Sequence, residues 1–339
     1  MSKAETPLSV IMLTYNREKL VARAVESILA QTFADFEYII INNGSTDRSG
    51  DICREYAKQD DRIRILDKEN GNIGSGRNAA LDLATGRYVI FIDDDDIAYP
   101  DMLEFLYGLV IDHDADISVC GSTKLENEQV LPNQVFSELL VMNSAEAVVE
   151  LLRRKRINSA NPCKLWKRRL FQNIRYMNEG CYDDIFVIYK LFAEAEKVVA
   201  HGLPKYHFYR HGGNNSSFTN NDLLLTPEQL EEYYAAFRER TEYLSSKLPS
   251  IADYARYSEW SYMISMCNKI IKNKLAHCRA QLSHARACLL DNYDEFYNSP
   301  YLENFEREYM DSYIRPYLDS DAISLDSRLS LGDMTLEEK

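Results

Sequence analysis

Four consecutive aspartates at positions 93–96 directly follow the apolar run Tyr88-Val-Ile-Phe-Ile. Carboxylates this close together repel one another and raise each other's pKa values unless a cation lies among them. Their hard oxygen atoms are suitable ligands for Mg²⁺ or Mn²⁺. A solvated acidic turn is the alternative, since most runs of like charge lie in solvent. The four aspartates alone do not distinguish a metal site from such a turn.

The apolar run predicts a buried strand that delivers the aspartates to the rim of a sheet. It is short and continuous and follows the turn signal Gly86, as is typical of strands in parallel sheets. Open α/β sheets bind ligands at the carboxyl ends of their strands. We therefore expect the aspartates to lie at a ligand-binding edge.

Strand and helix patterns alternate along the first third of the chain. Strands are predicted at residues 8–13, 36–41 and 62–66. Helices are predicted at residues 18–31 and 79–84, with a further helix between them that follows the turn at residues 42–47 and ends near residue 59. This alternation predicts right-handed crossovers and a mainly parallel sheet. The polar segments that follow the strands then share one edge and form one site. These segments are residues 14–17, 42–47, 69–78 and 93–96.

The segment at residues 69–78 is rich in glycine and leads into a predicted helix. Its Gly74-x-Gly76 spacing is too weak for a dinucleotide fingerprint, because the third glycine is missing and the segment does not follow the first strand. We expect the start of the helix and Arg77 to bind phosphate oxygens, since the acidic cluster is expected nearby. The alternative is that Arg77 is an ordinary arginine at the protein surface and binds no ligand.

The overall composition narrows the class of protein. The 339 residues carry a formal net charge of −14, which argues against general nucleic-acid binding. A phosphorylated ligand would therefore be held by a metal or by a local basic group. Neither a hydrophobic signal region nor an apolar stretch of membrane-spanning length is present in the sequence, so we expect a cytoplasmic protein. The seven cysteines form no Cys-x-x-Cys pair and are expected to be reduced thiols.

A series of motifs resembles the family 2 glycosyltransferases, which have the GT-A fold, and among them the enzymes that build bacterial surface polysaccharides. The motifs occur in family order over roughly the first third of the chain. They are Ser9-Val-Ile-Met-Leu-Thr-Tyr-Asn16, Ser27-Ile-Leu-Ala-Gln-Thr-Phe33, Asn42-Asn-Gly-Ser-Thr-Asp47, Arg77-Asn78, Ala84-Thr-Gly86 and Phe91-Ile-Asp93-Asp-Asp95-Asp.

The resemblance implies a nucleoside diphosphate sugar as donor, Mn²⁺ or Mg²⁺ on the Asp-x-Asp motif, and inversion at the anomeric carbon. The residues that it implies for donor binding are Thr14, Tyr15, Asn16, Asn43, Ser45, Arg77, Asp93, Asp94 and Arg210. Those implied for the metal are Asp95, Asp93 and His211.

One departure concerns the nucleobase. The family usually has Asp-Asp-Gly-Ser where this chain has Asn42-Asn43-Gly-Ser, so the base-reading acid corresponds to Asn43. An amide accepts a hydrogen bond from uracil N3–H, but it also donates. We expect UDP as the nucleotide.

The resemblance also implies a catalytic base. The family carries a Glu-Asp pair whose second acid is the base, and Asp183-Asp184 occupies that position. Asp184 is therefore the implied base, and Asp183 shortens the usual glutamate. Capping of a helix predicted at residues 185–195 is the structural alternative, because acids at a helix N-terminus stabilise its dipole.

A polar segment lies between this pair and the C-terminal helices. Family members often carry an arginine or a histidine near the diphosphate or metal, where this chain has Arg210-His211. A lone histidine is more often structural than a ligand, which is the alternative for His211. The following residues 212–221 could become ordered over bound donor as a lid.

The chain is expected to divide into a GT-A catalytic domain, residues 1–220, and a helical C-terminal region, residues 221–339. Within the first domain, residues 1–115 would bind the nucleotide sugar and residues 116–220 the acceptor. A helix is predicted from Pro227, after Thr226, and a second from residue 251 towards residue 290. Residues 261–290 contain five bases and no acid. This section could contact an anionic membrane carrying a lipid-linked acceptor or pack as an ordinary bundle.

Taken together, the sequence predicts an inverting transfer of a sugar to a hydroxyl group of a glycan or lipid-linked glycan, with metal assistance and an aspartate base. Two alternatives remain. A sugar-nucleotide nucleotidyltransferase would carry a long Gly-x-Gly-x-Arg segment after the first strand, where this chain has Thr14-Tyr-Asn-Arg17. A non-catalytic glycan-binding or scaffold protein would not need both Asp95 and Asp184.

Overall fold

The computed structural model describes residues 6–126, 129–211 and 222–318. The chain divides into two compact units, residues 1–214 and residues 215–339. The structure does not describe residues 212–221. The predicted lid and the predicted domain boundary between residues 220 and 221 both fall in this gap.

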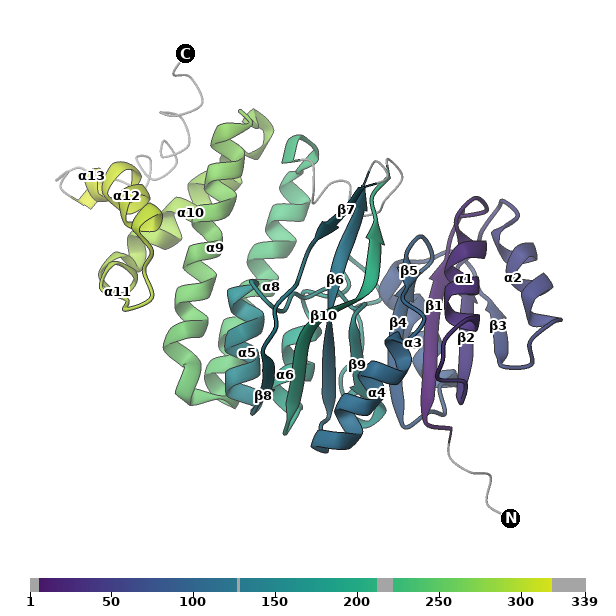
Figure 1. The fold of residues 1–339 in the computed structure, drawn as a ribbon. Coiled ribbons are helices and arrows are strands. Elements are labelled where there is room, and N and C mark those ends of the chain that lie inside the picture. Colours follow the sequence, from purple (N-terminus) through teal and green to yellow (C-terminus); the bar gives the residue numbers. More distant parts are fainter. Residues whose placement is uncertain (1–5, 127–128, 212–221, 319–339) are drawn as a thin grey trace. The chain divides into compact units, whose positions relative to one another are not determined.

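The first unit is built on a sheet with the strand order β3-β2-β1-β4-β9-β6-β10-β5. Its first four strands are parallel neighbours (Figure 1). They are β1 (Leu8–Thr14), β2 (Phe36–Asn42), β3 (Ile63–Asp67) and β4 (Tyr88–Asp93). Alternate side chains of β1 enter different layers: Val10 and Met12 belong to the main core cluster, whereas Leu13 faces Gly76 of α3.

The helices between these strands pack on the two faces of the sheet. α1 (Val21–Leu29), α2 (Ser49–Ala57) and α4 (Met102–His113) contribute apolar side chains to the main core cluster. α3 (Ile73–Leu83) packs against β1 and β2 from the other face. The predicted start of α3 near residue 79 is wrong, because the side chain of Asn72 accepts a hydrogen bond from Ser75 N and caps the helix earlier. Arg77 is therefore a helical residue and not part of a loop.

The second half of the sheet contains both antiparallel and parallel pairs. β9 (Lys164–Lys167) is antiparallel to both β4 and β6 (Ile117–Glu126). β6 therefore runs in the direction of β4, and β10 (Val198–Tyr209) is parallel to β6. The carboxyl end of β10 thus lies at the same edge as that of β4. The short strands β5 (Ile97–Ala98), β7 (Gln129–Pro132) and β8 (Leu139–Met142) add antiparallel pairs.

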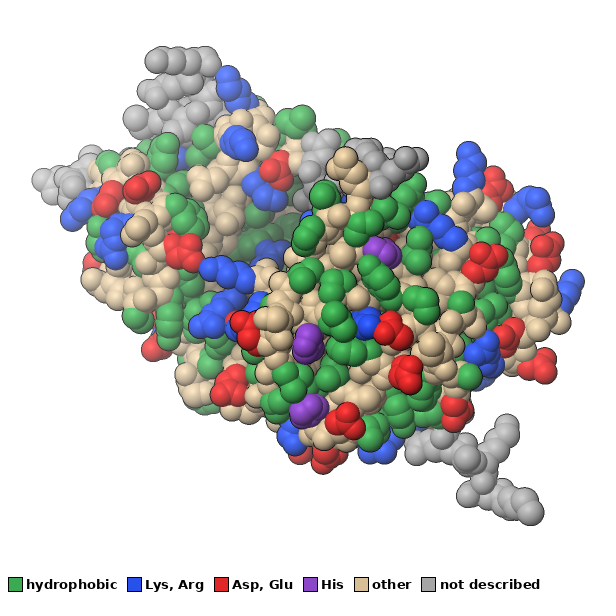
Figure 2. Space-filling model, in the orientation of Figure 1, with side chains coloured by type: hydrophobic (Ala, Val, Ile, Leu, Met, Phe, Trp, Pro, Cys, Tyr) green, Lys and Arg blue, Asp and Glu red, His purple; other side chains and the backbone are tan. Residues whose placement is uncertain are grey.

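Two further helices complete the first unit, α5 (Ser144–Arg153) and α6 (Ile188–Glu194). α6 begins three residues after the predicted position 185, because the residues before it form a turn. The basic run at residues 153–156 is partly tied to the protein itself, since Arg153 and Arg156 form ion pairs with the buried Glu150. Over α1 and α2, acidic and basic side chains are interspersed on the face that Figure 2 shows.

The second unit is helical. Its helices are α8 (Pro227–Lys247), α9 (Ala252–Lys272), α10 (Arg279–Asp291), α11 (Tyr293–Tyr297), α12 (Asn304–Tyr313) and α13 (Arg315–Leu318). Thr226 caps α8 in a reciprocal box with Gln229, with Pro227 in the first turn as predicted. Short 3-10 helices lie at Arg168–Phe171 in the first unit and at Asp222–Leu224, Pro249–Ile251 and Ala276–Cys278 in the second.

The single long helix predicted over residues 251–290 is wrong, because the chain breaks between α9 and α10. Lys274 adopts the left-handed conformation with φ 53°, and Leu275 N donates to Ile270 O at 3.0 Å in a helix-ending turn. Two of the five bases in this section are engaged within the unit: Arg286 is 1% exposed, and Lys269 pairs with Asp222 at 2.8 Å. None of the helices in the described parts of the chain is both long and apolar enough to cross a membrane.

Candidate functional site

The polar segments that follow β1, β2, β4 and β10 meet at one edge of the sheet. Tyr15 N donates to Asp94 Oδ2 at 3.2 Å, which joins the first segment to the aspartates. Asn16 N donates to Ser45 Oγ at 3.2 Å, which joins it to the second. Tyr209, the last residue of β10, donates from its backbone N to Asp96 Oδ1 at 2.7 Å. The convergence expected from strand order is therefore present, and the end of β10 belongs to it.

The positive charges and hydrogen-bond donors near the aspartates do not fully offset their burial and mutual repulsion. Burial, together with the charge of Asp95, raises the pKa of Asp94 to about 7, against the opposing effect of Thr14, Arg17 and Tyr15 N–H. Burial also raises the pKa of Asp96 well above its ordinary value, and the charges of Asp93 and Asp95 add to this. A bound cation at this edge would stabilise the ionised carboxylates.

Two arginines near the aspartates were not among the predicted site residues. Arg17 Nε lies 3.6 Å from Asp94 Oδ1 and 3.8 Å from Asp95 Oδ2. Arg23 donates to the backbone oxygen of Asp95, and its guanidinium carbon lies 3.8 Å from the centre of the Tyr209 ring. The segment Thr14-Tyr-Asn-Arg17 offered a signal for Arg17, whereas Arg23 lies within α1 and only the packing of α1 reveals its role.

Asp95 and His211 form the pair that best fits a metal. His211 Nε2 lies 2.9 Å from Asp95 Oδ2, a separation close to that of two adjacent ligands in an octahedral site with bonds of about 2.0–2.1 Å. Carboxylate oxygen and imidazole nitrogen are both ligands that Mn²⁺ accepts. In the described portions of the chain, no ready-made group of three or more histidine, cysteine or acidic side chains surrounds a metal position. The donor set therefore fits an ion that keeps several water or substrate ligands.

Arg77 connects the aspartates to the segment that carries the implied base. Arg77 is 7% exposed, packs its guanidinium against the rings of both Phe91 and Tyr176, and forms an ion pair with Asp183. The distance from Arg77 NH2 to Asp93 Oδ1 is 3.7 Å. The guanidinium thus faces two carboxylates, of which that of Asp183 is largely buried, and the sequence pattern did not indicate this arrangement.

Asp184 lies in the turn before α6. Its backbone oxygen accepts from both Val187 N and Ile188 N at 3.0 Å. The residue at the N-cap is Val187, and no side-chain hydrogen bond caps α6 within the described structure, so the structure does not support helix capping as the role of the Asp183-Asp184 pair. The carboxylate of Asp184 remains available for chemistry.

The protonation of Asp184 depends on burial and on three basic side chains. Burial raises the pKa of its carboxyl, while Arg77, its own backbone N–H, Arg154 and Lys164 oppose this effect. Lys164, on β9, is 1% exposed, and burial lowers its pKa to about 8. Lys164 was not predicted as a site residue, because its proximity to Asp184 follows only from the antiparallel placement of β9.

The segment leading to Asp184 is anchored on α3. Asn78 donates from Nδ2 to Tyr176 O at 2.9 Å and accepts from Tyr176 N at 3.0 Å. Asn72 Nδ2 donates to Met177 O at 3.1 Å. A methyl group at Gly74 would come within 2.1 Å of Met177 O, so glycine is required for this close approach. The Arg77-Asn78 motif therefore acts together with Asn72 and Gly74 to fix this segment.

The amide of Asn43 is held from both sides. Its Oδ1 accepts from Lys68 Nζ at 3.0 Å, and its Nδ2 donates to Gly71 O at 2.7 Å. The neighbouring Asn42 donates to Asp67 Oδ1 at 2.7 Å. Asp67 ends β3 and Lys68 follows it; neither residue was singled out in the sequence, although both lie at the same edge.

Comparison with known proteins decides the family. A family model described as "Glycosyl transferase family 2" matches residues 9–173. Glycosyltransferase GlyG of Streptococcus pneumoniae is 30% identical over 217 residues, which cover 61% of this chain and 72% of GlyG. The chain belongs to glycosyltransferase family 2. Glycosyltransferase GlyA of the same organism is 26% identical over 80% of this family 2 glycosyltransferase, but the match spans only 43% of GlyA.

Solved structures support the predicted fold of this family 2 glycosyltransferase. S. aureus TarS 1–349 in complex with UDP has a TM-score of 0.70 at 18% identity, covering 96% of this chain and 90% of TarS 1–349. The mannosyltransferase PcManGT from Pyrobaculum calidifontis, in complex with GDP-Man and Mn²⁺, has a TM-score of 0.51 at 14% identity, covering 96% of this chain and 84% of PcManGT. The GT-A fold is confirmed, as is the predicted enzyme class, so the nucleotidyltransferase and scaffold alternatives lose their support.

Proposed function

We propose that the chain transfers a sugar from a UDP-sugar to a hydroxyl group of a glycan or lipid-linked glycan, with inversion at the anomeric carbon. TarS 1–349 has been crystallised with UDP and with UDP-GlcNAc, which supports the choice of nucleotide. A poly(ribitol-phosphate) beta-glucosyltransferase from Bacillus spizizenii is 29% identical over 49% of this chain, which supports a surface polymer as acceptor.

The observation that carries the proposal is the position of Arg77 between Asp93 and Asp183. One guanidinium faces the last residue of β4 and pairs with the residue next to Asp184. The donor carboxylates and the base segment are therefore held on the same edge of the sheet. An enzyme that joins a donor and an acceptor needs both groups of residues in one place.

Asn43 is the residue proposed to read the base. Lys68 and Gly71 fix the orientation of its amide, and a carbonyl oxygen can accept a second hydrogen bond. Uracil N3–H would donate to Asn43 Oδ1, while Lys68 contributes a positive charge beside the uracil oxygens. Thr14, Tyr15, Asn16 and Ser45 line the same edge and are proposed to contact the nucleotide.

Asp95, His211 and Asp93 are the residues proposed to hold Mn²⁺ or Mg²⁺. When bound, such an ion neutralises diphosphate charge and stabilises the departing nucleotide. Mn²⁺ is present in the structure of PcManGT. Arg17 and Arg210 are proposed to supply further positive charge towards the diphosphate and the aspartates. Burial and the charges of Asp95 and Asp184 raise the pKa of Asp93 to about 6, while Arg77 and Arg210 oppose this rise.

Asp184 is proposed as the general base. It takes the proton of the acceptor hydroxyl while that oxygen bonds to the anomeric carbon and the bond from this carbon to the diphosphate oxygen breaks. Arg77 positions Asp184 through Asp183, and its positive charge favours the ionised carboxylate against the effect of burial. A positioned base of this kind contributes about 10²–10⁴-fold to the rate.

Peripheral contact with the cytoplasmic face of a membrane through residues 261–290 stays a proposal. Of the five bases in this section, Arg286 is buried and Lys269 forms an ion pair with Asp222, so at most three could face a membrane. Each basic residue near an anionic membrane surface contributes about 1 kcal/mol to binding, so these few charges would bind a membrane weakly.

A donor screen tests the proposed function. Thermal unfolding is followed with UDP, GDP, CDP and dTDP and their common sugar derivatives, with and without Mn²⁺. We expect UDP compounds with Mn²⁺ to raise the unfolding temperature, because a ligand at 100 times its Kd adds about 2.7 kcal/mol of stability. The same melting temperature with every nucleotide, in protein shown to be folded, would contradict the proposal.

A further inference from the structure

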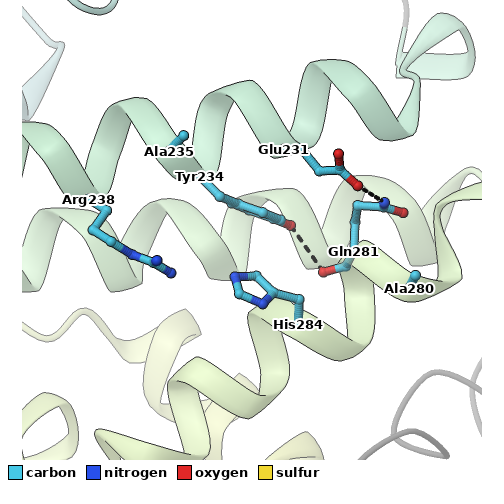
Figure 3. Close-up of a pocket in the computed structure, with 7 residues that line it drawn as sticks. All are labelled: Glu231, Tyr234, Ala235, Arg238, Ala280, Gln281 and His284. Atoms are coloured by element: carbon cyan, nitrogen blue, oxygen red, sulfur yellow. Dashed lines mark hydrogen bonds between the residues drawn. The ribbon is translucent and has the colours of Figure 1, made fainter.

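The helical unit contains a surface pocket of about 320 Å³ between α8 and α10 (Figure 3). Four of its lining residues recur along one face of α8, and three come from the facing side of α10. They are Glu231, Tyr234, Ala235 and Arg238 on α8, and Ala280, Gln281 and His284 on α10. The described function does not use any of these side chains.

Buried polar groups form the floor of the pocket. Tyr234 and Gln281 are 5% and 7% exposed, and the Tyr234 hydroxyl donates to the backbone oxygen of Gln281 at 3.4 Å. Gln281 Nε2 donates to Glu231 Oε1 at 2.7 Å. Its amide oxygen Oε1 is buried and accepts no hydrogen bond from the described part of the chain. This oxygen has no accessible surface, so the polar side chains that a ligand can reach in the pocket are the exposed Glu231, Arg238 and His284.

The charges of the pocket balance. Glu231 and Arg238 lie towards opposite ends in Figure 3. Burial and the positive charge of Arg238 lower the pKa of His284, so its imidazole is neutral at pH 7. One carboxylate, one guanidinium, one neutral imidazole and one amide give no net charge, which selects against strongly anionic or cationic ligands.

The space itself depends on two alanines. Ala235 and Ala280 face the pocket from α8 and α10, and both are exposed. A longer side chain at either position would enter the pocket without disturbing the core. Apolar methyl groups and the Tyr234 ring beside spaced hydrogen-bonding groups are the usual lining of small-molecule sites.

We propose that this pocket binds a neutral saccharide unit of the acceptor glycan, an inference that rests on the proposed function. Sugar hydroxyl groups donate and accept, so they can hydrogen-bond to the exposed side chains of Glu231, Arg238 and His284. The apolar face of a sugar ring fits the alanine methyl groups and Tyr234. Such a site would increase the affinity of the chain for acceptors that carry several sugar units.

Direct binding tests the proposal without turnover. Chitotriose, maltotriose and cellotriose are titrated into the full chain and followed by saturation-transfer NMR, with glycerol 3-phosphate as an anionic comparison. We expect at least one trisaccharide to bind, and Ala235→Leu and Glu231→Gln to weaken it at least about tenfold, the effect of losing roughly one well-placed contact. Glu242→Gln, an exposed change on the same helix outside the pocket, should leave binding unchanged.

The outcomes separate this inference from the proposed function. Binding without any sugar transfer would contradict the proposed function and leave the saccharide site standing. Transfer without trisaccharide binding, binding that Ala235→Leu does not weaken, or preference for glycerol 3-phosphate would overturn the saccharide site. In a chain that transfers sugar, Ala235→Leu should raise KM for a long acceptor and leave kcat on a monosaccharide acceptor unchanged.

Discussion

Nε2 of His211 lies 2.9 Å from Oδ2 of Asp95, although the two residues are 116 positions apart in the chain. The contact exists because β10 runs in the same direction as β4, so that both strands end at one edge. This pair joins the two halves of the sheet into one site and supplies the donor set proposed for the metal.

Replacing His211 should weaken the metal site. We expect His211→Ala to reduce Mn²⁺-dependent UDP binding at least about tenfold, the lower end of the cost of losing even an outer partner of a metal site. Calorimetric titration of UDP at several Mn²⁺ concentrations measures this. His113→Gln, a change at the last residue of α4, is the matched control. Equal Mn²⁺ dependence in His211→Ala and wild type would remove His211 from the site.

Removing Arg77 should destabilise the fold as well as the site. Arg77→Met leaves the largely buried carboxylate of Asp183 without its ion pair, and breaking a buried pair costs about 3–5 kcal/mol. Urea unfolding measures the loss. Arg54→Met serves as control, because the ion pairs of Arg54 lie at the surface and are worth about 0–1 kcal/mol. A similar decrease in the free energy of unfolding for both variants would contradict a stabilising role of the Arg77 ion pair.

The pH dependence of transfer should report Asp184. The base acts as a carboxylate, and burial raises its pKa above the ordinary value of 3.8, so kcat/KM should fall as pH drops through this raised pKa. Lys164→Met removes a charge that favours the ionised form and should move this acid limb to higher pH. Lys167→Met, on the same strand but paired with Asp116, should not move it. An acid limb that stays in place or moves to lower pH in Lys164→Met would argue against the assignment.

A methyl group at Gly74 should displace the base segment. Gly74→Ala brings Cβ within 2.1 Å of Met177 O, and misplacement of a catalytic group by about 1 Å can cost 10²-fold in rate. We expect kcat to fall while donor binding is retained. Gly108→Ala, on α4 with nothing within 4 Å of the added Cβ, should instead stabilise the protein by about 0.5–1 kcal/mol. A normal kcat in Gly74→Ala would mean that the segment is free to move.

The sequence predicted those features that depend on neighbours along the chain. Continuous apolar runs located β1, β2 and β4, and their parallel order placed Thr14, Asn43 and Asp93 at one edge. Thr226 and Pro227 marked the start of α8, because capping needs only adjacent residues.

Features that depend on distant contacts or unusual backbone conformations could not be predicted. The partners of Arg77 come from β4 and from the segment before α6, and Lys164 reaches the site only because β9 is inserted antiparallel to β4. The early start of α3 depends on Asn72 and on glycines that also occur in loops. The break after α9 falls at Lys274, which takes a left-handed conformation without a glycine or proline to signal it.

The role of Asp184 is the central claim and can be tested most directly. Single-turnover transfer from a UDP-sugar and calorimetric UDP binding are measured for wild type, for Asp184→Asn and for Asp112→Asn, an exposed aspartate on α4. The account predicts that Asp184→Asn loses about 10²–10⁴-fold in transfer with unchanged UDP affinity, and that Asp112→Asn behaves as wild type. Transfer that survives in Asp184→Asn, or UDP affinity that is lost together with transfer, would contradict it.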